Sequence, residues 1–150
     1  DVFELPVRAV GDTRALGDGA CEQAAIGVEL EDAHVDQRAA ALAEEFGLRA
    51  VPLEKAREAR LLVNATRVGL EDPSASPLPA ELLPEEGAVV DLVYRPLWTR
   101  FLREAQERGL KVQTGLPMLA WQGALAFRLW TGLLPDPSGM EEAARRALGV

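Results

Sequence analysis

The stretch "AVVDLVY", residues 88–94, has the strongest β-strand pattern in the sequence, because apolar and β-branched residues fill it almost without interruption. A strand that is apolar without alternation is typical of a parallel sheet covered on both faces. Whether such a sheet is present depends on the segments on either side of this stretch.

Shorter apolar runs and helical patterns alternate around it. We predict strands at 6–10, 28–32, 48–51, 61–64 and 110–113, and "LLVN" (61–64) is also expected to be covered on both faces. We predict helices at 17–27, 35–47, 53–59, 98–109 and 116–130, a helical turn at 80–83, and a final helix capped by Ser138. This alternation predicts an α/β fold: a Rossmann-like, doubly wound parallel sheet with helices on both faces, in one domain over residues 1–150.

The composition is that of an ordinary globular domain, with 150 residues, 48% of them hydrophobic and 27% charged. The sequence has no apolar run long enough for a membrane span, no secretory signal, and a single cysteine, Cys21, so we expect a cytoplasmic protein without disulfides or a metal site. The net charge is −8, and residues 1–36 carry −7 of it (nine acidic and two basic residues), which disfavours a nucleic-acid partner. The chain opens on Asp1 rather than Met, and we expect that an upstream part is missing.

Three groups of residues lie near predicted strand ends or on the last long helix, where ligands of parallel α/β folds bind. The loop "NATRVG" (64–69) could turn the Asn64 amide toward a ligand, or form an Asx-type turn out of the sheet. Tyr94 could present its hydroxyl to a ligand crevice, or lie at the edge of the core. Gln122 shares a helical face with Met118, Leu119, Leu125 and Ala126. Its amide could hold a polar substrate, or be a core amide satisfied by a backbone carbonyl.

Three motifs in the same order resemble the shikimate dehydrogenase family: "NATRVG", "DLVYRPLWT" (91–99) and "GLPMLAWQGALAFRLWTG" (115–132). The match covers about residues 37–150. The resemblance implies NADP as cofactor and the reversible reduction of 3-dehydroshikimate to shikimate, in the chorismate pathway of aromatic amino acid biosynthesis. It also implies cofactor contacts by Asn64, Ala65, Thr66, Leu92, Gly115 and Met118, and substrate contacts by Tyr94 and Gln122. Asp91 is expected to hold the strand end in shape rather than to react.

Other family features are replaced or missing. The family carries its catalytic Lys and Asp in an amino-terminal domain, and neither Lys55 nor Lys111 lies in a matching motif, so we expect no catalytic residue here and that domain as the missing partner. The family's glycine loop is replaced by "VGDTRALGDGA" (10–20), and its N-R-[ST] motif by "DAHVD" (32–36). Residues 1–36 therefore fit the family poorly, and we expect NADP binding to be weakened or lost, with no preference for NADP over NAD.

The leading hypothesis is the cofactor-binding half of a shikimate dehydrogenase, inactive by itself. One alternative is a non-catalytic Rossmann-like domain with a degenerate cofactor site. Another is a related quinate/shikimate or amino-shikimate dehydrogenase. We also expect self-association, because the missing domain would leave apolar sides uncovered on the helix at 116–130 and on the final helix (Met140, Ala143, Ala144, Ala147 and Leu148).

Overall fold

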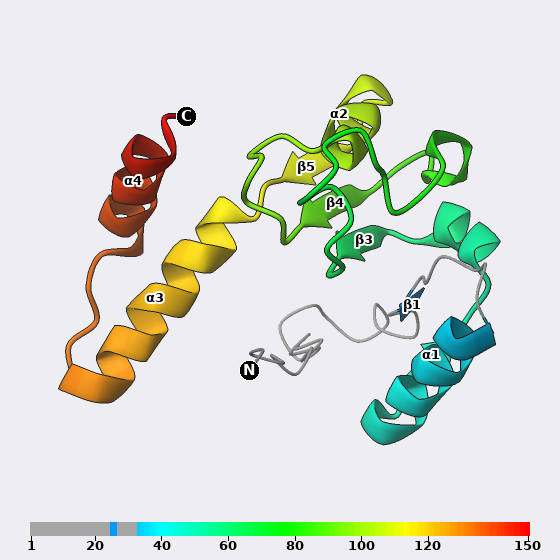
Figure 1. Cartoon of the computed structure of the whole chain (residues 1–150), viewed down its shortest axis with the longest axis horizontal. Helices are drawn as coiled ribbons and strands as arrows, with labels where there is room; N and C mark the ends of the chain where they lie inside the picture. Colours follow the sequence, from blue (N-terminus) through cyan, green and yellow to red (C-terminus); the bar gives the residue numbers. More distant parts are fainter. Residues whose placement is uncertain (1–24, 27–32) are drawn as a thin grey trace.

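The computed structural model describes residues 25–26 and 33–150 of the chain (Figure 1). Its strands are β1 (Ala25–Ile26), β2 (Arg49–Ala50), β3 (Leu61–Asn64), β4 (Ala88–Asp91) and β5 (Lys111–Gln113). Its helices are α1 (Ala33–Phe46), α2 (Arg100–Glu107), α3 (Leu116–Thr131) and α4 (Pro137–Leu148), with 3-10 helices η2 (Leu53–Glu58) and η3 (Ala80–Leu82). The strands predicted at 6–10 and 28–32 lie outside the described residues.

A parallel sheet with strand order β3-β4-β5 forms the centre of the described structure. In its register Asn64 lies opposite Asp91, and Val90 lies opposite Gln113. The carboxyl ends of the strands therefore lie along one edge, followed by the loop at 64–69, the segment after Asp91 and the start of α3. The predicted α/β class with a parallel sheet is confirmed.

Helix α2 packs on β4 and β5 and contributes Phe101, Leu102 and Ala105 to the core. It begins after Thr99, whose hydroxyl oxygen accepts a hydrogen bond from the backbone N–H of Leu102 at 3.4 Å, an N-cap. The helix was predicted from residue 98, two positions too early, because this cap fixes its start. The core cluster consists of Ala56, Leu78, Leu83, Val89, Phe101, Leu102, Ala105 and Leu110.

Strand β3 differs from its prediction. Leu61 and Val63 are 56% and 50% exposed, so the expectation of a strand covered on both faces is wrong within the described part of the chain. The reason is the alternation of side chains along the strand: Leu62 packs on the core cluster, and Leu61 and Val63 point to the opposite face.

The helix predicted at 17–27 is also wrong at its end. Ala25–Ile26 form the short strand β1, which pairs in parallel with Arg49–Ala50 of β2. Pairing with a distant segment overrides a weak local helix propensity here. The remainder of that prediction lies outside the described residues.

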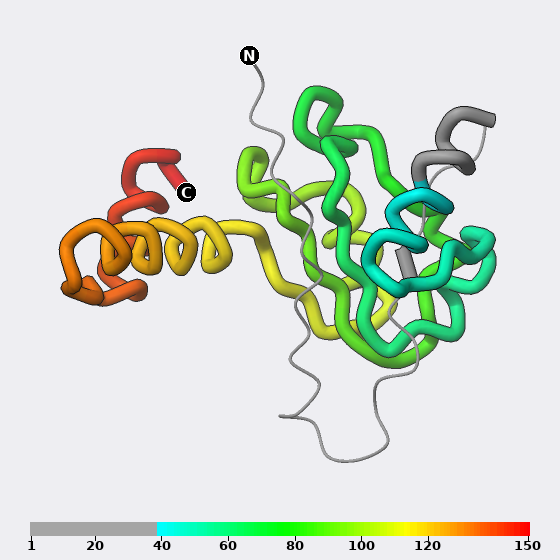
Figure 2. The backbone as a smooth tube through the Cα atoms, turned by 90° about the horizontal axis from the view of Figure 1, so that it is seen from below, coloured from blue at the N-terminus to red at the C-terminus, as the bar shows by residue number. Residues whose placement is uncertain are grey.

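Helices α3 and α4 pack on each other and extend away from the sheet (Figures 1 and 2). Helix α3 ends at Gly132, which has a positive φ of 78°. Helix α4 is capped by Asp136, whose carboxylate accepts from the N–H groups of Ser138 and Gly139, so the prediction of Ser138 as the cap is wrong. An aspartate one residue before Pro137 reaches both amides, and Ser138 already lies in the first turn.

The apolar stripe of α4 has a partner in this chain. A Cβ on Gly123 of α3 would lie 2.8 Å from the terminal methyl of Met140, so the two helices approach closely there. Met140, Ala144 and Leu148 are half-buried, whereas Ala143 and Ala147 are exposed. The expectation that this stripe is uncovered is therefore wrong for three of its five residues. Among the described residues, no helix is long and apolar enough to cross a membrane.

Candidate functional site

The carboxyl edge of the sheet is built around a buried hydrogen-bond network that joins three segments. The Asn64 amide nitrogen donates to Asp91 Oδ1 at 3.0 Å, across the two paired strands. The same Oδ1 accepts from the backbone N–H of Val93 at 2.9 Å, and Asp91 Oδ2 accepts from the Thr99 hydroxyl at 2.6 Å. The end of β3, the end of β4 and the start of α2 are thus tied to one carboxylate.

The side chain of Asn64 is fully used inside this network. Its Nδ2 also donates to the Val68 carbonyl at 3.2 Å, and its Oδ1 accepts from both the backbone N–H and the hydroxyl of Thr66, at 3.0 and 2.7 Å. Both donors and both lone pairs of the amide are therefore occupied. Of the two interpretations left open for this loop, the geometry favours an Asx-type turn, which leaves Ala65 and Thr66 exposed at the edge.

Asp91 is completely buried, and the hydrogen bonds it accepts come from neutral groups. Burial raises the pKa of its carboxyl above the ordinary value, although the hydrogen bonds from Thr99, Val93 and Asn64 partly oppose this. The hydrogen bond to the N–H two residues ahead also turns the chain out of the strand. This is why β4 ends at Asp91 rather than at the predicted Tyr94.

The start of α3 lies against the segment that follows β4. A Cβ on Gly115 would come within 2.5 Å of the carbonyl oxygen of Leu92 and 2.7 Å of that of Val93, so only glycine allows the two backbones this approach. The N–H of Leu92 in turn donates to the carbonyl of Asn64 at 3.0 Å. Three residues predicted to contact the cofactor, Asn64, Leu92 and Gly115, are thus brought together.

The other predicted residues lie at or near this edge. Met118 lies in the first turn of α3 and is half-buried. Tyr94 is 37% exposed, three residues beyond the end of β4, and is followed by a cis Arg95–Pro96 bond. Gln122 lies on α3 with its side chain exposed and forms no hydrogen bond with the described part of the chain. The structure therefore excludes the core-amide interpretation of Gln122.

The groups at this edge that are named below are apolar or uncharged, and such a lining suits a planar ring better than a phosphate group. The edge presents exposed Ala65 and Thr66, the half-buried Leu92 and Met118, and backbone at Gly115, while the one carboxylate of the network is buried. The nearby Arg67 is paired with Glu71. The stretch at 10–20, where the family has its glycine loop, lies outside the described residues.

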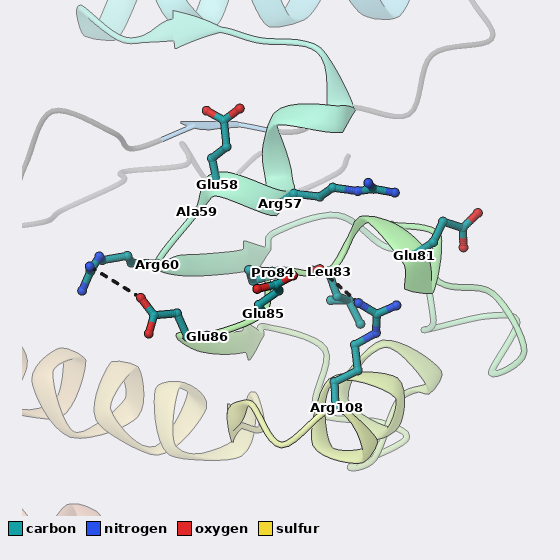
Figure 3. A pocket seen from close by; sticks show the side chains of 10 residues that line it. All are labelled: Arg57, Glu58, Ala59, Arg60, Glu81, Leu83, Pro84, Glu85, Glu86 and Arg108. Carbon is teal, nitrogen blue, oxygen red and sulfur yellow. Dashed lines mark hydrogen bonds and ion pairs between the residues drawn. The ribbon is translucent and has the colours of Figure 1, made fainter.

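A cavity lined by described residues lies elsewhere. It has a volume of about 460 Å³ and lies at the amino ends of the strands, opposite the edge described above (Figure 3). Its walls carry charges of both signs, among them an Arg60–Glu86 ion pair at 3.6 Å, and Arg108 donates to the Leu83 carbonyl at 3.3 Å. A surface with charges of both signs does not indicate which kind of ligand would bind there. None of the predicted site residues lines this cavity.

Sequence reasoning missed the role of Thr99. The residue was visible as the last position of "DLVYRPLWT", eight residues after Asp91, but a hydroxyl that caps a helix while donating to a buried carboxylate has no signature beyond that spacing. Val93 was also missed, because it acts through its backbone.

The chain is similar to proteins of one family. A family model described as the shikimate 5'-dehydrogenase C-terminal domain matches residues 115–145. The shikimate dehydrogenase (NADP(+)) of one strain of Thermus thermophilus is 99% identical over 114 residues, which are 76% of this chain and 43% of that protein. The chain therefore spans less than half the length of this relative.

Two solved structures extend the comparison. The crystal structure of a Thermus thermophilus shikimate 5-dehydrogenase in complex with NADP(H) and shikimate matches with a TM-score of 0.73 and 95% identity, over 75% of this chain and 43% of that one. A quinate dehydrogenase from Corynebacterium glutamicum in complex with NAD matches with a TM-score of 0.61 and 31% identity, over 71% of this chain and 42% of that one. Over the matched residues, the chain belongs to the shikimate dehydrogenase family and corresponds to the C-terminal part of its members.

Proposed function

We propose that this chain is the cofactor-binding half of an NADP-linked shikimate dehydrogenase, which catalyses the reversible reduction of 3-dehydroshikimate to shikimate. The observation that carries the proposal is the approach of Gly115 to Leu92, together with the hydrogen bond from Leu92 to Asn64. These contacts bring all three family motifs to one edge of the parallel sheet, where ligands of such folds bind. The near identity to the Thermus protein supports the same conclusion.

In this proposal Leu92 and Gly115 form the floor on which the nicotinamide ring rests. Ala65 and Thr66 border it from the loop after β3, Asn64 holds that loop in place, and Met118 borders it from α3. The bound cofactor supplies the hydride. The residues of this chain bind and orient: the Tyr94 hydroxyl and the Gln122 amide, both exposed, hold hydroxyl groups of the substrate.

The chemistry needs a further part that handles the substrate's proton. General acid–base catalysis typically contributes about 10²–10⁴-fold, and the resemblance assigns that role to an amino-terminal domain. We propose that this domain is the partner of the chain, that residues 1–150 form a single Rossmann-like domain, and that the protein works in the cytoplasm.

Ligand titrations of the purified chain test the cofactor half of the proposal. NADPH and NADH are titrated separately and binding is followed by nicotinamide fluorescence. We expect saturable but weak binding, without preference for NADPH, because the acidic "DAHVD" replaces the family's arginine motif. Binding of neither cofactor would favour the alternative of a non-catalytic domain with a degenerate site.

A ligand-observed NMR titration tests the substrate half. Shikimate and quinate are compared in the presence of NADP⁺, with Gln122→Ala as the variant and Gln106→Ala, an exposed glutamine on α2, as the matched control. We expect the shikimate signal to be lost only in Gln122→Ala. A chain that binds quinate in preference to shikimate would favour the quinate dehydrogenase alternative.

A further inference from the structure

The two oxygens of the Asp91 carboxylate serve different parts of the structure. Oδ1 accepts from Asn64 and from the N–H of Val93, on either side of the Leu92 backbone. Within the described part of the chain, Oδ2 accepts only from Thr99, at the start of α2. One oxygen therefore faces the proposed nicotinamide floor, and the other faces the helix that covers the core.

The Oδ1 contacts fix the relative position of two segments of the edge. Loop 64–69 is held by the Asn64 side chain, which is itself anchored on Oδ1. The backbone of Leu92 is held on both sides. Its own N–H donates to the carbonyl of Asn64, and the next N–H along the chain, that of Val93, donates to Oδ1. Gly115 is then seated against Leu92.

We propose that Asp91 is a positioning residue of the cofactor site: its Oδ1 holds loop 64–69 and Leu92 at the spacing that the nicotinamide ring requires, while its Oδ2 serves only α2. This inference rests on the proposed function. Asp91 itself is fully buried, so in this proposal it acts through its neighbours and not by contact with cofactor or substrate.

Three variants distinguish the roles of the two oxygens of Asp91. Asp91→Ala removes the contacts of both oxygens. Thr99→Val removes the hydroxyl that meets Oδ2 and caps α2, and leaves both Oδ1 contacts in place. Asp91→Asn is the conservative rescue: its amide oxygen can replace Oδ1, while its NH₂ group faces Thr99. All three are expected to lower the melting temperature, because each leaves a buried polar group without its partner.

The readout is the dissociation constant of NADPH compared with that of 2′,5′-ADP, which has the adenosine phosphate half but no nicotinamide. Asp91→Ala should raise the dissociation constant of NADPH roughly tenfold, because the loss of about one hydrogen bond changes the binding free energy by that factor. The dissociation constant of 2′,5′-ADP should stay unchanged. Thr99→Val and Asp91→Asn should keep the wild-type ratio of the two constants. A merely structural role would weaken both ligands alike, or give Thr99→Val the effect of Asp91→Ala, and either result overturns the proposal.

Two further measurements cover the remaining outcomes. If Asp91→Ala does not fold, Asn64→Ala removes the same Oδ1 contact from the loop side and must reproduce the selective loss of NADPH. If the wild-type chain binds neither ligand, the proposed function is contradicted, and amide hydrogen exchange decides the positioning role by itself. Exchange at Thr66 and Val93 must then rise in Asp91→Ala and stay unchanged in Thr99→Val. Equal exchange in the two variants would refute the positioning role.

Discussion

Gly115 at the start of α3 lies so close to the carbonyl oxygen of Leu92 that a Cβ on residue 115 would stand 2.5 Å from it. Its backbone angles, φ −73° and ψ −10°, are open to any residue, so the glycine is required by space and not by conformation. Backbone atoms surround the position, and they cannot move aside as a side chain can.

Gly115→Ala should therefore destabilise the chain by about 1–3 kcal/mol, the usual cost of overpacking, and weaken cofactor binding by pushing α3 away from Leu92. The matched control is Gly123→Ala in the same helix, where the added Cβ meets only the flexible end of Met140. That change should lie within about 1 kcal/mol of wild type, because alanine favours the helix. Urea denaturation measures both. Equal losses for the two variants would contradict the assignment of Gly115 as a backbone contact.

The pH dependence of stability should carry the sign of a buried carboxyl. Because burial raises the pKa of Asp91 in the folded state, the folded chain binds its proton more tightly than the unfolded chain does. The contribution of Asp91 to the free energy of unfolding should fall as pH rises from its ordinary pKa of about 3.9 to the raised folded value, and stay constant above it. The measurement is the difference in unfolding free energy between wild type and Asp91→Asn as a function of pH.

Asp72 provides a control of opposite sign. Its carboxylate accepts from the hydroxyl and the N–H of Ser74, and these hydrogen bonds lower its pKa. Its contribution should be present above the ordinary pKa and be lost as pH falls through the lowered one. If the wild-type and Asp91→Asn curves keep a constant separation across the acid range, the raised pKa of Asp91 is refuted.

The sequence predicted those parts of the fold that depend on local pattern. Strand β3 was predicted with its observed bounds. Helix α1 ends at Phe46, one residue before the predicted end, and is followed by Gly47 with a φ of 65° and by Leu48, whose N–H donates back to Ala43. The errors arise where side chains and backbone groups meet in ways that pattern does not record. Strand β4 ends before its predicted end because the Asp91 carboxylate accepts a hydrogen bond from the N–H of Val93. Helix α4 begins before its predicted start because the Asp136 carboxylate accepts from two backbone amides.

The candidate site shows the same division. The motifs placed Asn64, Leu92 and Gly115 correctly at one edge of the sheet, since parallel strands have their carboxyl ends together. They did not reveal that the Asn64 amide is fully hydrogen-bonded to Thr66, Val68 and Asp91. Asp91 lies 27 residues away, and a partner at that distance follows from strand register and not from sequence spacing.

Gln122→Ala should leave folding nearly unchanged. The side chain is exposed on α3 and has no hydrogen-bond partner among the described residues, so its removal strands no buried group. Alanine is also a better helix former than glutamine by a few tenths of a kcal/mol. Thermal melts of both proteins check this. A loss well above about 1 kcal/mol would show that the amide is structural and not a substrate contact.

The far end of α3 should make the isolated chain self-associate. Leu129 and Trp130 in the last turn of α3 are 86% and 81% exposed, and Leu133, just beyond the helix, is 69% exposed. Three further apolar side chains of α3 are also exposed: Trp121, Leu125 and Phe127. Contiguous apolar surface beyond a few hundred Å² marks an interface or an aggregation risk. Leu119→Glu would be a poor test of this association, because Leu119 is half-buried and a charge there would also disturb packing.

Leu129→Glu is the sharper test, because it changes a side chain that is almost fully exposed in the monomer. Losing the burial of one leucine, about 1.5–3 kcal/mol, should weaken association at least roughly tenfold without lowering the melting temperature of the monomer. Gln106→Glu on α2 adds the same charge at an exposed polar position and should leave association unchanged. Sedimentation velocity and light scattering follow all three proteins. If the wild-type chain is a monodisperse monomer at high concentration, this apolar end is tolerated in water and the prediction is wrong.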